Sequence, residues 1–385
     1  MSLSRRSFVH TMGAGAAGLW IAGRGREGSL FGGEALQAQG PAPSVILSSN
    51  ENPLGCHKDV LGAVRGAMTE AGRYPFATAF EVTELVAKKH NVKPENVLLG
   101  SGSTQILRTA THVFTTKTAG LVAAMPAYEE CADYARLMGH PITGVKLSSD
   151  LKTDLDAMLV ASKGAGLVFA CNPNNPVATA VSTADARTYL AKLMQQSPTT
   201  TVLVDEAYFE YATMAGYETM IPDAIANPRI VVARTFSKCF GMAGLRIGYA
   251  VAHKDTIAKM AAWDDISNIS VMALEGARAA LAVPDSWVKE EQRRNAEART
   301  FTQKWFADHG YTPTDSQTNF MFVNIKRPSK GFREACLKDG VLVARDFPPY
   351  ENSHVRISVG TMAEMQRAVQ VFDKVLSAPA KAAAA

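Results

Sequence analysis

Short apolar runs that alternate with helical patterns constrain the fold of this chain more than any other feature of its sequence. After Pro43 each run is a few residues long, rich in Val, Ile, Leu or Ala, and bounded by Gly, Pro, Asn or Asp. Such runs are typical of strands that helices cover on both faces. The pattern predicts an α/β fold with a largely parallel sheet, and the expected strands are Val97–Leu99, Leu121–Ala124, Leu167–Ala170, Val202–Val204, Ile230–Ala233 and Ile247–Val251.

The residues directly after each run have the best claim to chemistry, because ligands of open α/β sheets bind beyond the carboxyl ends of the strands. These segments carry polar, charged or aromatic side chains. They are Gly100–Thr104, Pro126–Tyr128, Asn172–Pro176, Asp205–Tyr208 and Thr235–Lys238.

A second, smaller α/β unit is expected near the C-terminus. Residues 283–299 are charged with a helical period, and three later runs resemble strands: Asn319–Val323, Gly340–Arg345 and His354–Val359. We predict five parts in the 385 residues: a signal and linker (1–40), an N-terminal arm (41–58), a large ligand-binding domain (59–285), a small C-terminal domain (286–378) and a tail (379–385).

Charge and cysteine content argue against several function classes. The net charge is +4, or +2 without residues 1–40, and there are no runs of Lys or Arg, so a nucleic-acid partner is not expected. The five cysteines are odd in number and lack any C-x-x-C spacing. Neither a disulfide framework nor a metal site is therefore predicted.

The N-terminus carries Arg5 and Arg6, followed by the weakly apolar stretch Thr11–Gly23. This resembles a twin-arginine export signal and predicts a periplasmic or secreted protein. The stretch is too short and glycine-rich to anchor in a bilayer, which takes about 20 apolar residues, so no stable membrane insertion is expected. The alternative interpretation is a disordered basic tail.

Lys238 stands in a pattern that points to covalent chemistry. A lysine shielded from water has a lowered pKa and can act as an amine nucleophile. Here Ser237 precedes it and Arg246 follows eight residues later, within Ala243–Tyr249. With the other strand-end segments, this closely resembles the pyridoxal-phosphate (PLP) enzymes of fold-type I, the class I/II aminotransferases, nearest to the histidinol-phosphate aminotransferase group. The resemblance runs from about Ser48 to Val371.

The resemblance implies a large PLP-binding domain with a mostly parallel seven-stranded sheet, and a smaller α/β C-terminal domain. It implies that Lys238 carries PLP as a Schiff base and, once freed, moves a proton. Asp205 is implied to pair with the pyridinium nitrogen, which strengthens the cofactor as an electron sink. Tyr208 and Asn175 are implied to bind the phenolic oxygen, although Pro176–Thr179 lacks the family's glycine, which puts the local backbone in doubt.

The remaining cofactor contacts follow from the same resemblance. Tyr128 matches the residue that stacks on the ring. The phosphate is expected at a helix start, held by backbone N–H groups, hydroxyls and a guanidinium, from Gly102, Ser103, Thr104, Ser237 and Arg246. Thr104 and Gln105 stand where close relatives have acidic residues, so a less anionic cup is expected.

Substrate and partner contacts are also implied by the resemblance. Tyr74 matches a tyrosine that reaches the neighbouring subunit's phosphate, which implies a homodimer. Arg356 matches the arginine that binds the substrate carboxylate or phosphate, and Arg345 a second anion-binding arginine. Asn52 lies in Asn50–Gly55, which resembles the arm that closes over the substrate.

The function we expect is a ping-pong transfer of an amino group between an amino acid or amine, histidinol-phosphate-like or aromatic, and a 2-oxo acid. One alternative is a PLP-dependent decarboxylase or lyase, since the fold and the cofactor site are shared. A second is a PLP-binding protein without turnover.

Overall fold

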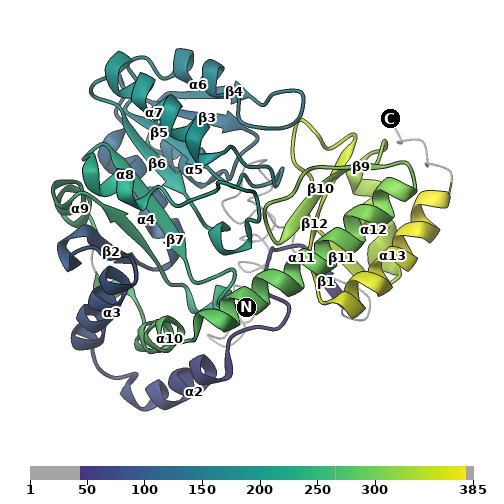
Figure 1. The fold of residues 1–385 in the computed structure, drawn as a ribbon, viewed down its shortest axis with the longest axis horizontal. Coiled ribbons are helices and arrows are strands. Elements are labelled where there is room, and N and C mark those ends of the chain that lie inside the picture. Colours follow the sequence, from purple (N-terminus) through teal and green to yellow (C-terminus); the bar gives the residue numbers. More distant parts are fainter. Residues whose placement is uncertain (1–43, 265, 379–385) are drawn as a thin grey trace, which may run out of the picture. The chain divides into compact units, whose positions relative to one another are not determined.

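The computed structural model describes residues 44–264 and 266–378 (Figure 1). The predicted signal and linker, 1–40, the first residues of the arm, 41–43, and the C-terminal tail, 379–385, lie outside the described residues.

A seven-stranded sheet forms the centre of the large domain, in the order β2-β8-β7-β6-β5-β3-β4. Only β8 runs opposite to the other strands of this sheet. The mostly parallel seven-stranded sheet is therefore confirmed. Its strands are β2 (Val97–Gly100), β3 (Leu121–Met125), β4 (Ile142–Lys146), β5 (Leu167–Cys171), β6 (Thr201–Asp205), β7 (Ile230–Thr235) and β8 (Gly248–Ala252).

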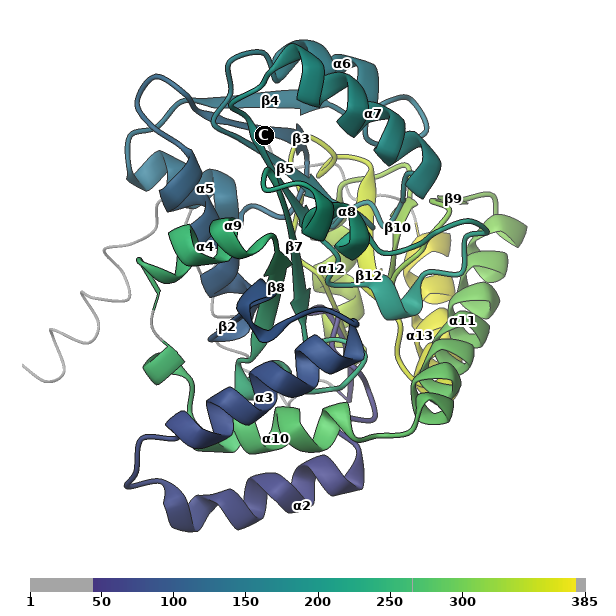
Figure 2. The ribbon, with the colours of Figure 1, turned by 60° about the vertical axis from the view of Figure 1, so that its left-hand side comes forward.

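Helices cover both faces of this sheet, which Figure 2 shows nearly edge-on. Along β3, Leu121 and Ala123 pack into one apolar cluster and Val122 and Ala124 into another, because successive side chains of a strand point to opposite faces. The first cluster includes residues of α4 (Gly102–Phe114), α5 (Glu130–Leu137) and α9 (Lys254–Ala261), and the second includes residues of α6 (Leu155–Ala161), α7 (Thr183–Gln196) and α8 (Ile221–Ala226).

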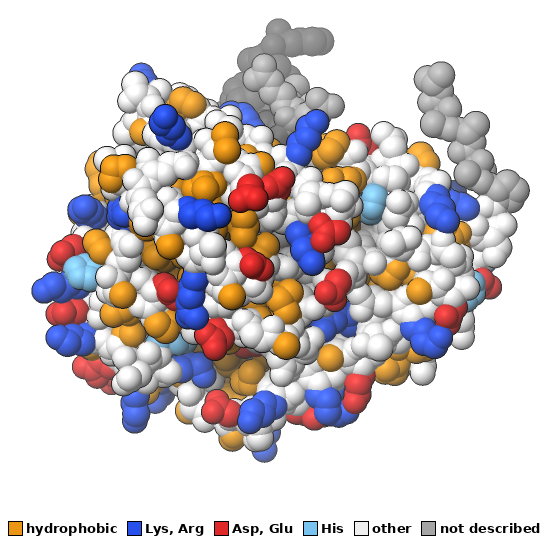
Figure 3. Space-filling view, turned by 45° about the horizontal axis from the view of Figure 1, so that its top comes forward, with side chains coloured by type: hydrophobic (Ala, Val, Ile, Leu, Met, Phe, Trp, Pro, Cys, Tyr) orange, Lys and Arg blue, Asp and Glu red, His pale blue; other side chains and the backbone are white. Residues whose placement is uncertain are grey.

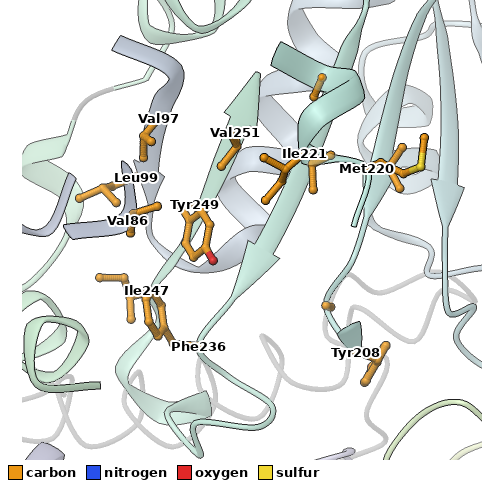
Figure 4. Packing of buried hydrophobic residues seen from close by; sticks show 14 of the residues in the cluster. Val86, Val97, Leu99, Tyr208, Met220, Ile221, Phe236, Ile247, Tyr249 and Val251 are labelled. Atoms are coloured by element: carbon orange, nitrogen blue, oxygen red, sulfur yellow. The ribbon is translucent and has the colours of Figure 1, made fainter. Parts of the chain in front are cut away.

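The second cluster continues along the antiparallel edge of the sheet. Figure 4 shows Val97 and Leu99 of β2 beside Val251 and Tyr249 of β8, with Val86 packed nearby. Val86 belongs to α3 (Phe76–Lys89), which packs with α10 (Val271–Leu281), and α10 in turn packs with α2 (Lys58–Ala67). Short 3-10 helices span Met68–Glu70, Pro94–Asn96, Phe209–Tyr211, Ala243–Leu245 and Ile266–Asn268.

The small C-terminal domain has its own apolar core, which includes Phe306, Met321, Phe332 and Phe372. It contains an antiparallel sheet in the order β12-β10-β9 and three helices among the described residues. Its elements are α11 (Asp285–Asp308), β9 (Thr312–Pro313), β10 (Phe320–Asn324), α12 (Ser329–Lys338), β11 (Val341–Val343), β12 (His354–Ser358) and α13 (Met362–Ser377).

The N-terminal arm joins the two domains. Its strand β1 (Val45–Leu47) pairs in parallel with β11 of the small domain, Val45 opposite Val341. A few residues later the arm lies on the large domain, where the Cys56 thiol donates a hydrogen bond of 3.0 Å to the carbonyl of Gly241. Residues 48–56 therefore pass from one domain to the other.

The charged side chains form no large field of one sign on the face shown in Figure 3, where basic and acidic groups are interspersed. Within the part of the chain that the structure describes, no helix is long and apolar enough to cross a lipid bilayer.

Candidate active site

Asp205 and Lys238 lie at the carboxyl ends of the neighbouring strands β6 and β7. Asp205 is the last residue of β6 and faces Ala233 of β7, and Lys238 follows the end of β7. Asp205 is 3% exposed, and its carboxylate accepts a hydrogen bond of 3.2 Å from the backbone N–H of Ala207. The strand pattern therefore brings a buried acid and a basic group to one edge of the sheet.

The two groups have perturbed proton affinities. Burial raises the pKa of Asp205 to about 7, although the charge of Lys238 opposes the shift. Burial also lowers the pKa of Lys238 to about 8, and the guanidinium of Arg356 adds to this, while Glu51 and Asp205 oppose it. A buried carboxyl that lacks full compensation can be stabilised by a cationic ligand, and a lysine with a lowered pKa is partly neutral near physiological pH.

A cup of hydrogen-bond donors lies where α4 begins. The guanidinium of Arg246 donates 3.3 Å hydrogen bonds to the hydroxyls of Ser237 and Thr104. Gly102 opens α4 with a φ of 73°, and a Cβ there would collide with the same guanidinium. The backbone N–H groups of Gly102, Ser103 and Thr104 belong to the first turn, whose donors have no partner within the helix. The structure thus brings all five predicted phosphate-binding residues together.

Tyrosines from two strand ends line the region. Tyr128 follows β3 and is partly buried; burial raises its pKa to about 12, and a hydrogen bond with Thr104 opposes this. Tyr208 is 4% exposed, its ring centre lies 5.6 Å from Lys238 Nζ, and its hydroxyl accepts a 3.1 Å hydrogen bond from the side chain of Asn50. Tyr128 and Tyr208 therefore adjoin other members of the predicted site.

Arg356 and Asn175 are in direct contact. Arg356 Nη1 donates a 2.7 Å hydrogen bond to Asn175 Oδ1, and Nη2 donates one of 2.6 Å to the carbonyl of Ser48. Its Nε is buried without a hydrogen-bond partner among the described residues. Burial lowers the pKa of Arg356 to about 10. An unpartnered buried donor on a cation is suited to an anionic ligand.

The turn after Asn175 closes without the family's glycine. Ala178 adopts a φ of 67°, a left-handed conformation that glycine takes most easily. Its N–H donates a 2.7 Å hydrogen bond to Asn174, and the N–H of Asn174 donates one of 2.8 Å to Thr179. The substitution is therefore accommodated by backbone strain in the turn.

Three predicted site residues lie apart from this cluster or are otherwise engaged. The amide of Asn52 donates 2.9 Å hydrogen bonds to Cys239 and to Glu291, so these contacts hold the arm and do not support a substrate role. Tyr74 is 76% exposed and stacks on Phe76, with 5.7 Å between ring centres. Arg345 forms an ion pair with Glu129.

The arm supplies contacts that sequence reasoning missed. The carbonyl of Ser48 accepts from Arg356, the carbonyl of Ser49 accepts a 3.4 Å hydrogen bond from Lys238 Nζ, and Asn50 donates to Tyr208. Two of these three contacts are made by backbone carbonyls, which leave no residue-type signal in a sequence. Asn50, at a φ of 55°, makes its contact through its side chain, but the sequence pointed to the nearby Asn52 instead.

These residues fit PLP. The glycine-lined cup at the start of α4 offers backbone, hydroxyl and guanidinium donors for a phosphate dianion. Asp205 offers a buried carboxyl for a protonated ring nitrogen, and Lys238 offers an amine of lowered pKa for the aldehyde carbon.

Comparison with known proteins agrees with this geometry. The family model for aminotransferase class I and II matches residues 42–372. The chain is 32% identical to histidinol-phosphate aminotransferase of Bacillus cytotoxicus, over 86% of this chain and 88% of that protein, and 33% identical to that of Symbiobacterium thermophilum, over 86% and 90%. The crystal structure of histidinol-phosphate aminotransferase from Sinorhizobium meliloti in complex with pyridoxal-5'-phosphate superposes with a TM-score of 0.80 at 26% identity, covering 87% of this chain and 91% of that one. The chain belongs to the family of class I and II aminotransferases, with the fold-type I architecture.

Proposed function

We propose that this chain is a PLP-dependent transaminase that moves an amino group between an amino acid or amine and a 2-oxo acid in two half-reactions. The observation that carries the proposal is the position of Lys238 and Asp205 at the ends of adjacent strands, each within electrostatic range of the other. Bound PLP supplies an electron sink for the substrate carbon next to the amino group.

Lys238 is proposed to hold the cofactor covalently and then to move a proton. When it is not bound to the cofactor, its Nζ would be a free amine whose pKa is lowered by burial. Such an amine can take a proton from the substrate Cα and return it later, as a general base and acid. Tyr208, whose ring adjoins Nζ, and Asn175 are proposed to bind the phenolic oxygen.

Arg356 is proposed to orient the substrate by its carboxylate. Its two terminal nitrogens already bind Asn175 and Ser48, which fixes the plane of the guanidinium, and its buried Nε is unpartnered among the described residues. A carboxylate held by Arg356 would be kept from the position in which bound PLP activates a bond of Cα, and this would favour proton removal over loss of CO₂.

The direct test is the product from a panel of amino acids, including aromatic ones, and histidinol phosphate, given to the purified PLP-loaded protein. Transamination predicts 2-oxo acid, or the oxo product of an amine, in amounts equal to the amino group transferred and without CO₂. Release of CO₂ without oxo acid would favour a decarboxylase of the same fold. A visible spectrum that no amino compound changes would favour a binding protein without turnover.

A homodimer with shared active sites is part of the proposal. It is supported by the exposure of Met68, Tyr74 and Phe80, at 66%, 76% and 63%, around the start of α3. A short segment with several large, exposed apolar or aromatic side chains is a candidate for an interface. We propose that Tyr74 reaches the phosphate of the other subunit.

Mixed dimers test this arrangement. Lys238→Ala removes a subunit's own catalytic amine, and Tyr74→Ala impairs the partner's site, so one site of a mixed dimer keeps both groups. Coexpression of the two impaired variants should therefore give about a quarter of wild-type activity from the intact sites. No restoration, or a monomer in sedimentation, would rule out the shared site.

Twin-arginine export to the periplasm or medium is proposed from residues 1–40, which lie outside the described residues. A fusion of residues 1–42 to a reporter should be exported, and the fusion with Arg5→Lys and Arg6→Lys should stay in the cytoplasm. A wild-type fusion that stays in the cytoplasm would refute this localisation.

A further inference from the structure

An ion pair stands beside the proposed carboxylate site and takes no part in the reaction described above. Glu129, the residue after Tyr128, pairs with Arg345, 216 positions later in the chain. Arg345 Nη1 also donates a 3.0 Å hydrogen bond to the carbonyl of Asp346. Both side chains are partly exposed, at 45% for Glu129 and 38% for Arg345, so a ligand can reach them.

The pair lies next to Arg356. The guanidinium carbons of Arg345 and Arg356 lie 4.5 Å and 4.6 Å from the centre of the same Phe347 ring. Burial is the main cause of the lowered pKa of Arg356, but Arg345 lowers it further and Glu129 opposes the shift. All three charges therefore act on one region of the site.

The charges of Arg345, Arg356 and Glu129 do not cancel one another. Among the described residues, Arg356 binds two neutral acceptors, the Asn175 amide and the Ser48 carbonyl, and no carboxylate there is in direct contact with its guanidinium. Arg345 has a carboxylate in direct contact, Glu129. The region therefore presents one uncompensated positive charge, which matches a ligand with one carboxylate.

We propose that Glu129 is a specificity-determining residue, which cancels the charge of Arg345 and so selects amino donors with a single carboxylate over donors that carry a second anionic group. This inference rests on the proposed function, in which Arg356 holds the substrate carboxylate. A carboxylate or phosphate at the far end of a donor must approach Glu129 or displace it from Arg345. Like charges at such range, partly screened by water, change affinity by about tenfold.

Binding to the PLP-loaded protein tests the proposal without turnover. Calorimetry compares succinate, which has two carboxylates, with butyrate, which has one. Glu129→Gln should tighten succinate binding about tenfold and change butyrate binding by less than about twofold. The ratio of kcat/KM for glutamate to that for leucine should rise by a similar factor.

Two control variants locate the effect. Asp133→Asn removes a carboxylate of α5, the helix that begins directly after Glu129; Asp133 pairs with Arg136, and its loss should change neither affinity. Glu129→Gln combined with Arg345→Gln should lose the gain for succinate, because the gain comes from the uncovered guanidinium. The exposed ion pair contributes little to folding, so these variants should remain folded.

The outcomes separate this inference from the proposed function. An unchanged or lower preference for succinate in Glu129→Gln would overturn the role of Glu129, whatever the reaction. Butyrate binding that survives Arg356→Gln would instead contradict the proposed carboxylate site. In that case the change in succinate affinity from the wild type to Glu129→Gln would still show whether Glu129 cancels the charge of Arg345.

Discussion

Asn50 donates a hydrogen bond of 3.1 Å from its side chain to the hydroxyl of Tyr208, and so ties the N-terminal arm to the proposed cofactor pocket. The hydroxyl of Ser358 donates to Asn50 Oδ1 at 2.9 Å, and the amide of Asn319 donates to the Asn50 carbonyl at 3.0 Å. Ser358 and Asn319 belong to the small domain, whereas Tyr208 belongs to the large one. One buried side chain thus couples the position of the small domain to a residue beside Lys238.

Replacing Asn50 by alanine should therefore affect both stability and activity. Loss of the two buried side-chain hydrogen bonds, to Tyr208 and from Ser358, is expected to lower the free energy of unfolding by about 1–3 kcal/mol and kcat/KM by about tenfold or more. Asn91→Ala is the matched control, because Asn91 is an exposed asparagine with a similar φ of 52°. It should lose only the cost of a left-handed alanine, about 1 kcal/mol, and keep full activity. Equal activity losses in the two variants would contradict the coupling.

Asp205 should make the cofactor-free protein less stable as pH rises. Its pKa in the folded protein, about 7, lies above the ordinary value of 3.8, so between these values the folded state binds more protons than the unfolded chain. The stability that Asp205 contributes is full below pH 4 and is lost as pH rises through 7. Asp205→Asn should remove this dependence and, without PLP, be more stable at pH 8 by about 2–4 kcal/mol.

Adding PLP should make the wild type more stable than Asp205→Asn, because only the wild type offers a carboxylate to the ring nitrogen. Urea unfolding at pH 4, 6 and 8, with and without PLP, measures both effects. A cofactor-free Asp205→Asn protein that is less stable than the wild type at pH 8 would show that Asp205 is not an uncompensated buried charge.

The rate at which PLP enters the protein should follow the titration of Lys238. Only the neutral amine attacks an aldehyde, and burial lowers the pKa of Lys238 to about 8 from an ordinary 10.5. The rate of appearance of the visible absorbance should therefore rise with pH around a midpoint near 8. A midpoint close to 10.5 would mean that Lys238 is solvated before PLP binds.

Arg356→Lys should separate binding of the carboxylate from chemistry at the amino group. Lysine cannot reproduce the planar fork that holds Asn175 and Ser48 while presenting a further donor to a ligand. For amino acids kcat/KM should fall about 100-fold, or about 3 kcal/mol. For amines without a carboxylate it should change by less than about twofold. A uniform loss for both donor types would indicate a structural role alone.

Much of the large sheet could be predicted because its strands are buried on both faces, so each appears as an apolar run. The edge strand β4 was missed because its residues are mostly exposed and interrupted by Gly144. Strand direction leaves no trace in composition, so β8 gave no sign that it runs antiparallel. The strand β1 was missed because three residues bounded by serines become a strand only by pairing with β11.

The residues of the candidate site also separate into those that the sequence could predict and those that it could not. Asp205, Tyr208 and Lys238 could be predicted because each position is set locally, by the end of a strand. The contact of Asn50 with Tyr208 joins residues 158 positions apart and depends on how the arm and the domains pack. The same holds for Glu129 and Arg345, since neither residue carries a local sign of the other.

The covalent attachment of the cofactor to Lys238 is the most direct test of the proposed active site. The PLP-loaded protein can be reduced with borohydride, digested and analysed by mass spectrometry. We predict one phosphopyridoxyl group per chain, on Lys238, and a Lys238→Ala protein that binds PLP without modification and forms no oxo acid. A modified lysine elsewhere, or full transaminase activity in Lys238→Ala, would contradict it.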